Sequence, residues 1–340
     1  MSKLTRRNFI ATAGAGAGGL TAALALPTSS ANAASTVSSA GSANSADSES
    51  PDVLTRKFYT VLSLSRIGFS APFEQSVVLA HQYGFQAVDP DEKLFAQLSD
   101  DGLKKLLDDL AAKNLKFGAA GLPVDFRKDE ATFSSDLKKL PDAAEVLRRA
   151  GVSRVSTYVL SCSNTLTYLQ NFRQHACRLR ECAKILADHG QLMGLEYVAT
   201  RTVWRSESQP FIHTMSEMKE LEVAIGTNNL GIQLDSWHWY NAQETGADIE
   251  TLRNRQVITV DLNDAPRLPL DEQYDNHREL PAATGVIPVK VFLQSLAAIG
   301  YDGPIQAEPF NAQLRAMPLD QAVAATAAAI HKAFSEAGLA

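Results

Sequence analysis

Four acidic side chains stand inside apolar segments of the chain, where an unpartnered carboxylate is costly. They are Glu196, Asp235, Asp261 and Glu308. One such residue alone could be a helix N-cap or half of an ion pair, but four gathered at one place would repel one another strongly. A divalent cation is the simplest way to hold them together, and an all-oxygen set suits Mg²⁺ or Mn²⁺, with Co²⁺ also possible.

The segments that must position these residues alternate between short apolar runs and stretches with helical spacing. The apolar runs predict strands at residues 58–64, 87–89, 117–122, 154–160, 193–198, 231–235, 257–262 and 304–308. The helical spacing predicts helices at residues 73–83, 100–115, 134–150, 166–189, 215–225, 248–253, 289–299 and 319–337. Eight strand–helix pairs predict an α/β fold with a single (β/α)8 TIM barrel.

The competing architecture is an open doubly wound sheet, which usually carries a glycine-rich phosphate loop after its first strand. Here the first predicted strand is followed by Ser65-Arg66-Ile67-Gly68, which lacks that motif. In a TIM barrel the active site lies at the carboxyl ends of the strands. The four carboxylates end the fifth to eighth predicted strands, so we expect them to meet near the barrel axis.

Three sequence motifs at these strand ends, taken together, indicate a resemblance to a known family. They are Gly-Leu-Glu-Tyr, Leu-Asp-Ser-Trp-His-Trp and Gly-Tyr-Asp-Gly-Pro-Ile-Gln-Ala-Glu-Pro-Phe. The last two-thirds of the chain resembles the sugar phosphate isomerase/epimerase family, with its xylose isomerase-like TIM barrel. The resemblance implies a metal-dependent sugar isomerase or epimerase that abstracts a proton next to a carbonyl and forms an enediolate.

The resemblance also implies a role for each candidate residue. Glu196 and Glu308 are the implied acid/base pair, one removing the proton and the other delivering it. His238 and Arg278 are implied substrate contacts, and Trp237 is predicted to form part of an aromatic wall against the sugar ring. The implied ligands of the divalent metal (Mn²⁺, Mg²⁺ or Co²⁺) are Glu196, Asp235, Asp261 and Glu308.

One position departs from the family pattern, because Asp261 stands where the family usually has a histidine. Four carboxylates stay net negative even with a divalent ion. Three solutions are open: a preference for a harder metal, one carboxyl held protonated, or ligation by a neighbour such as Asn263.

Two other functions remain open beside the isomerase or epimerase. The first is a metal-dependent lyase or dehydratase acting on a keto-sugar or inosose, which would use the same enolisation and then expel a leaving group. The second is an exported, non-catalytic sugar-binding protein whose metal site has decayed. The substitution at Asp261 is the main support for the second.

The N-terminal residues predict an export signal. Residues 1–33 combine Arg6-Arg7-Asn8-Phe9 with an Ala/Gly-rich apolar stretch and end in Ala31-Asn32-Ala33, which resembles a twin-arginine signal peptide. Residues 34–55 predict a disordered Ser/Ala-rich linker, and residues 56–340 the barrel. The expected location is therefore the periplasm or another site reached by twin-arginine export.

Composition excludes several other classes of protein. The net charge of −6 offers no basic face for nucleic acid. The absence of a long apolar run argues against stable membrane insertion, and three cysteines are too few for a disulfide framework. The expected partner is a small-molecule sugar or sugar derivative, and the family resemblance makes a homo-oligomer possible.

Overall fold

The computed structural model describes residues 54–340. The predicted signal peptide and all but the last two residues of the predicted linker lie outside this range. Within it, no helix combines the length and the apolar character that crossing a bilayer would demand.

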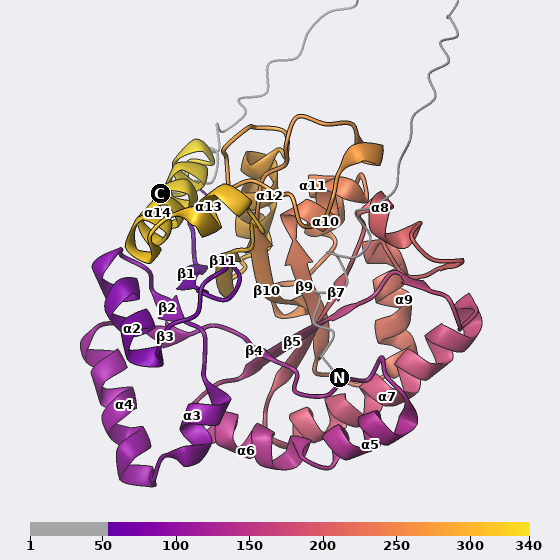
Figure 1. Cartoon of the computed structure of the whole chain (residues 1–340), viewed down its shortest axis with the longest axis horizontal. Helices are drawn as coiled ribbons and strands as arrows, with labels where there is room; N and C mark the ends of the chain where they lie inside the picture. The colour runs from indigo at the N-terminus through magenta and orange to yellow at the C-terminus, as the bar shows by residue number, and fades with distance from the viewer. Residues whose placement is uncertain (1–53) are drawn as a thin grey trace, which may run out of the picture.

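A curled parallel sheet forms the centre of the molecule (Figure 1). Its strands are β1 (Tyr59–Leu62), β2 (Ala87–Val88), β3 (Lys116–Phe117), β4 (Ala120–Gly121), β5 (Arg154–Val159), β7 (Leu192–Tyr197), β9 (Leu230–Asp235), β10 (Val257–Leu262) and β11 (Pro304–Ala307). Their hydrogen-bonded order is β3-β2-β1-β11-β10-β9-β7-β5-β4. The end strands β3 and β4 lie in one stretch, residues 116–121, and count as a single interrupted strand. The sheet therefore closes on itself as an eight-stranded barrel. The predicted TIM barrel is confirmed.

Helices surround the strands (Figure 1). They are α2 (Phe73–Gln82), α3 (Glu92–Gln97), α4 (Asp100–Ala112), α5 (Glu130–Leu137), α6 (Leu140–Arg149), α7 (Tyr168–Asp188), α8 (Arg201–Trp204), α9 (Met215–Ile225), α10 (Ser236–Asn241), α11 (Gly246–Glu250), α12 (Val289–Ala298), α13 (Ala312–Ala316) and α14 (Leu319–Glu336). A two-stranded antiparallel pair, β6 (Cys162–Ser163) with β8 (Gln209–Pro210), stands apart from the barrel.

Two predicted elements are interrupted for identifiable reasons. The helix expected at 134–150 is in fact α5 followed by α6, because Asp129 caps the first and Pro141 lies in the first turn of the second. The third strand breaks around Gly118, where an added Cβ would lie 2.9 Å from Val61 Cγ1. The Val61 side chain, which projects from β1, occupies the space that a Cβ at position 118 would need.

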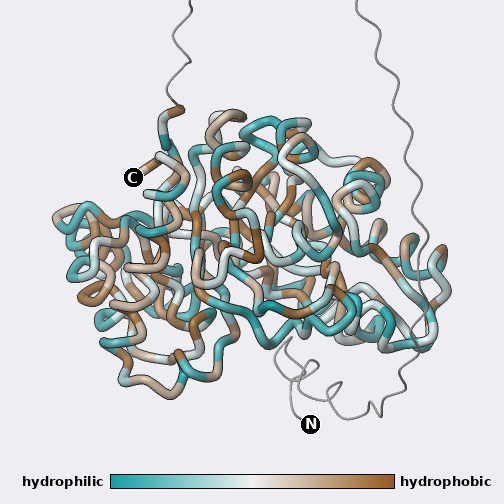
Figure 2. The backbone as a smooth tube through the Cα atoms, turned by 90° about the horizontal axis from the view of Figure 1, so that it is seen from above, coloured by the Kyte–Doolittle hydropathy of each residue, from teal (hydrophilic) through white to brown (hydrophobic). Residues whose placement is uncertain are grey.

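The core lies between the strands and the inner faces of the helices. All six residues of β10 are buried, as expected of a strand covered on both sides. Along the peripheral helices hydrophobic and hydrophilic residues alternate (Figure 2), as expected of helices with one buried face. Inside the barrel, however, Gln233, Thr259 and Gln306 are buried polar residues, and two of them serve the site described next.

Candidate active site

The four predicted carboxylates meet at the carboxyl ends of β7, β9, β10 and β11. Asp261 lies in register with Asp235 on β9 and with Gln306 on β11, so these side chains stand at one level of the barrel. Oxygens of Glu196, Asp235, Asp261 and Glu308 all lie within 4.8 Å of one another, and all four residues are buried. The predicted gathering of these residues is confirmed.

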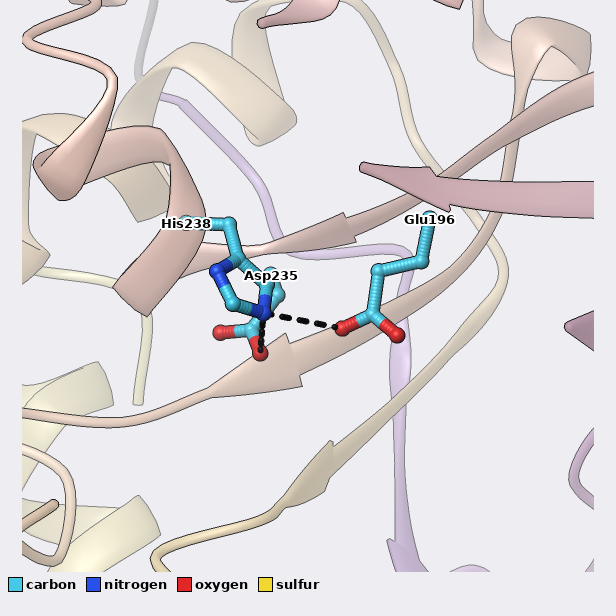
Figure 3. Close-up of side chains that lie close together, drawn as sticks. All are labelled: Glu196, Asp235 and His238. Carbon is cyan, nitrogen blue, oxygen red and sulfur yellow. Dashed lines mark ion pairs between the residues drawn. The ribbon is translucent and has the colours of Figure 1, made fainter. Parts of the chain in front are cut away.

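Asp235 serves two purposes. It ends β9 and caps α10, since its Oδ1 accepts a 2.8 Å hydrogen bond from the Trp237 backbone N–H. The first turn of α10 then brings the His238 ring back toward the carboxylates. Figure 3 shows the ring beside both acids, with Nε2 3.5 Å from Glu196 Oε1 and 3.8 Å from Asp235 Oδ2.

The protonation of the His238 ring follows from its backbone contact. The Ala199 N–H donates to His238 Nδ1 at 3.1 Å, so Nδ1 must be unprotonated. A proton on the neutral ring is therefore carried by Nε2, which lies 3.5 Å from both Glu196 Oε1 and Asp275 Oδ1. This arrangement places the ring N–H close to Glu196, a candidate acid/base group, and equally close to Asp275.

Arg278 is a buried clamp between carboxylates. It is only 1% exposed, and its Nη1 donates to Asp235 Oδ2 at 2.8 Å and to Glu308 Oε2 at 3.1 Å. Its Nη2 donates to Asp275 Oδ1 at 2.7 Å. The guanidinium thus fixes the orientation of two predicted metal ligands while Asp275 holds it in place.

The loop that carries Arg278 is itself anchored by a carboxylate. Asp264 accepts hydrogen bonds from the backbone N–H groups of Thr284, Gly285 and Ile287 at 2.7–2.9 Å. Asp264 and Glu279 also exchange backbone hydrogen bonds. These contacts fold the segment after β10 back over the barrel mouth, which is how a residue from the middle of a long loop reaches Asp235.

Sequence reasoning did not include Arg66, which also enters the carboxylate cluster. It follows β1, and its Nη1 lies 2.9 Å from both Asp261 Oδ2 and Glu308 Oε1. Burial acts to lower the pKa of Arg66, but the charges of Asp261 and Glu308 outweigh burial and raise it. The guanidinium therefore stays charged. Its place directly after the first strand was the only sequence signal that could have pointed to it.

Asp261 is surrounded by hydrogen-bond donors. Besides Arg66, the side-chain amide of Gln233 donates to Oδ2 at 2.7 Å and that of Gln306 to Oδ1 at 2.8 Å. Burial raises the pKa of Asp261, Arg66 opposes this, and the charges of Glu308 and Asp235 add to it. The site thus accommodates an acid at this position through hydrogen bonds from two side-chain amides and the nearby charge of Arg66.

Asn263, considered above as a substitute ligand, is committed elsewhere. Its Nδ2 donates to Asp235 Oδ1 at 3.0 Å, and its Oδ1 accepts from the Glu308 backbone N–H at 2.9 Å. It cross-links the ends of β9 and β11 and so contributes to the site as a brace.

A cavity of about 940 Å³ opens onto the cluster, and Arg66, Glu196, Gln233 and Glu308 are among its lining residues. The three predicted substrate contacts are not part of that lining. His238, Trp237 and Arg278 are buried around the carboxylates instead, and the Trp237 indole N–H donates to Thr200 Oγ1 at 2.8 Å. Their predicted contact with substrate stays a prediction.

The fold and the acidic strand ends define a barrel of known type. The family described as "Xylose isomerase-like TIM barrel" matches residues 77–333, and the chain belongs to this family.

Similar proteins include both isomerases and dehydratases. An inosose isomerase of Bacillus velezensis is 22% identical over 247 residues, covering 72% of this chain and 84% of that protein. A 3-dehydroshikimate dehydratase of Pseudomonas aeruginosa is 30% identical over 162 residues, covering 47% of this chain and only 24% of that protein. The crystal structure of the IolI protein, described with a bound zinc atom, superposes with a TM-score of 0.69 at 16% identity, covering 82% of this chain and 99% of the other.

The donor set fits a hard divalent cation in type and approximately in spacing. Buried carboxylate oxygens from four residues lie within 4.8 Å of one another. Six-coordinate Mg²⁺ places its oxygen ligands about 2.1 Å away, hence no more than about 4.2 Å apart. To hold such an ion, the oxygens would move closer together and some would give up hydrogen bonds that Arg66 or Arg278 now donates to them.

Proposed function

We propose that this chain is a metal-dependent isomerase or epimerase acting next to the carbonyl of a sugar or a cyclic polyol ketone. The observation that carries the proposal is the pair Glu196 and Glu308. These two carboxylates come from different strands, lie within 4.8 Å of each other and face the same cavity. The inosose isomerase among the similar proteins supports this class of substrate.

The metal would be held by Glu196, Asp235, Asp261 and Glu308, and the zinc of the IolI structure supports a divalent ion at such a site. When bound, it would supply positive charge next to the oxygen that becomes negative as the proton leaves.

Proton transfer would be carried out by the side chains of the cluster. One glutamate takes the proton from the carbon next to the carbonyl, and the other returns a proton to the neighbouring position or to the opposite face. Arg278 keeps Glu308 oriented through its bond to Oε2. His238, with its proton on Nε2, stabilises the charged form of Glu196 when that residue is the base.

A second candidate reaction is dehydration of a keto-substrate. The 30% identity to the 3-dehydroshikimate dehydratase favours it. The same two glutamates would form the same enolate, after which a hydroxyl on the next carbon leaves with a proton. The two reactions share the first step and differ in their products.

The test is exchange of substrate protons with solvent deuterium, followed by ¹H NMR. Metal-loaded protein is incubated in D₂O with a panel of keto-sugars and inososes. Loss of the proton next to the carbonyl, with a new isomer and no loss of water, supports the proposal. Loss of water supports the dehydratase, and binding without exchange would support the non-catalytic sugar-binding protein.

Two variants assign the roles. Glu196→Gln and Glu308→Gln should each lower the exchange rate at least about 100-fold, as expected when a general acid or base is lost. Glu222→Gln on α9 is the matched control, since it alters a glutamate outside the cluster. Wild-type exchange in either site variant would refute the assigned role.

A further inference from the structure

A tight turn fixes the position of Arg66. The Ile67 and Phe69 N–H groups donate to the carbonyls of Ser63 and Leu64, at 3.3 and 2.8 Å. Gly68 has φ +100°, and a Cβ there would lie 2.2 Å from Arg315 Cγ. Only glycine can satisfy both constraints, and the resulting turn aims Arg66 inward across the barrel mouth.

The Arg66 guanidinium lies beside two oxygens that are proposed to bind the metal ion. Arg66 Nη1 is 2.9 Å from both Asp261 Oδ2 and Glu308 Oε1. A cation bound about 2.1 Å from the same two oxygens would lie within about 4 Å of that nitrogen, wherever it sat around the pair. Two positive charges so close in a buried site repel each other strongly, so an ion on Asp261 Oδ2 and Glu308 Oε1 would displace Arg66. Arg278 contacts different oxygens, Asp235 Oδ2 and Glu308 Oε2.

Arg66 has room to withdraw. Its side chain is 21% exposed, whereas Arg278 is fully buried. It lines the 940 Å³ cavity, and so does Asp89, whose charge already attracts Arg66. Rotation of the Arg66 side chain into this cavity, toward Asp89, would take the guanidinium away from Asp261 and Glu308.

We propose that Arg66 is an exchangeable cation that holds the metal position and must swing into the cavity before a divalent ion binds. Arg66 thereby sets the affinity of the site for the ion. This inference rests on the metal dependence proposed above. Loss of the Arg66 charge should increase metal affinity, whereas loss of an ordinary structural arginine would leave it unchanged or reduce it.

The experiment measures Mn²⁺ binding by isothermal titration calorimetry to the full chain stripped with chelator. Arg66→Gln removes the charge and should bind Mn²⁺ at least tenfold more tightly than wild type. Arg66→Lys keeps the charge and should stay within about threefold of wild type. Arg127→Gln is the matched control, because Arg127 lines the same cavity with a similar exposure of 23% and pairs with Asp125 instead.

A second measurement needs no substitution. Phenylglyoxal modifies accessible guanidinium groups, and peptide mass spectrometry reports each arginine separately. Modification of Arg66 in the wild-type chain should rise several-fold when Mn²⁺ is added, while that of Arg127 stays constant.

Equal or weaker Mn²⁺ binding by Arg66→Gln, or unchanged Arg66 modification in a chain that binds Mn²⁺, would overturn the exchange but leave the proposed function standing. Failure of every variant and of the wild type to bind Mn²⁺ would instead refute metal dependence, and the exchange would fall with it.

Discussion

Two roles have been given to Arg278, a substrate contact expected from the sequence and a structural clamp seen in the fold, and one substitution distinguishes them. The change is Arg278→Ala. In the folded protein Arg278 bonds Asp235, Asp275 and Glu308, and the side chains of Arg278, Asp235 and Asp275 have no exposed surface. Removing the cation takes an ion-pair partner from all three carboxylates, and two of them, Asp235 and Asp275, have no exposed surface through which water could replace it.

The expected cost is large. Removing one partner of a buried ion pair typically destabilises a protein by about 3–5 kcal/mol, because the other charge remains buried and uncompensated. Here one cation serves three acids, so we expect the upper part of that range. The assay is equilibrium urea unfolding followed by tryptophan fluorescence, in chelator so that no metal substitutes for the lost charge.

The control is Arg201→Ala, which removes a partly exposed ion pair with Asp271 near the same loops. Exposed pairs contribute less than about 1 kcal/mol, so this variant should stay close to wild type. A loss below about 1 kcal/mol in Arg278→Ala would refute the clamp. If such a stable variant had a raised KM, the substrate contact predicted from the sequence would be the better account.

Two further predictions concern other parts of the chain. Burial lowers the pKa of His175 from 6.5 to about 4, so the unfolded state binds more protons and stability is lost as the pH falls through this window. Between pH 7 and pH 4, the free energy of unfolding measured in urea should fall by about 3 kcal/mol more in the wild type than in His175→Gln. Equal falls in the two proteins would contradict this. Replacing Arg6 and Arg7 together by lysine should retain the precursor in the cytoplasm on cell fractionation, and unchanged export would exclude the twin-arginine route.

The regular elements could be predicted because their signals are local. The bounds of α9 and β10 agree with the predicted ranges 215–225 and 257–262. For α9 the signals were apolar spacing and a glycine, Gly226, that adopts the left-handed conformation at its end. The short helix α10 was not predicted, because its sequence Ser-Trp-His-Trp-Tyr-Asn is rich in aromatic residues that favour strands.

The four carboxylates could also be predicted, because acids inside apolar runs stand out in any sequence. Their partners could not. Arg66 contacts Asp261 and Glu308 across 195 and 242 residues of sequence. An arginine in a loop is usually a solvated charge, and only closure of the barrel beside β1 reveals that this one belongs to the site.

Asp261 and Arg66 are best understood as one unit. The family resemblance implies a neutral histidine where Asp261 stands, so this chain carries an additional negative charge at the barrel mouth. Gln233 and Gln306 solvate that charge from the neighbouring strands, and Arg66 balances it. A decayed metal site would keep such a cation permanently, whereas an exchangeable one gives way to a divalent ion, so Mn²⁺ titration of wild type and Arg66→Gln separates the two accounts. In the proposed exchange the cluster already has a cation of its own, and a divalent ion would enter by replacing that positive group, so the four acids would never face one another without a counter-charge.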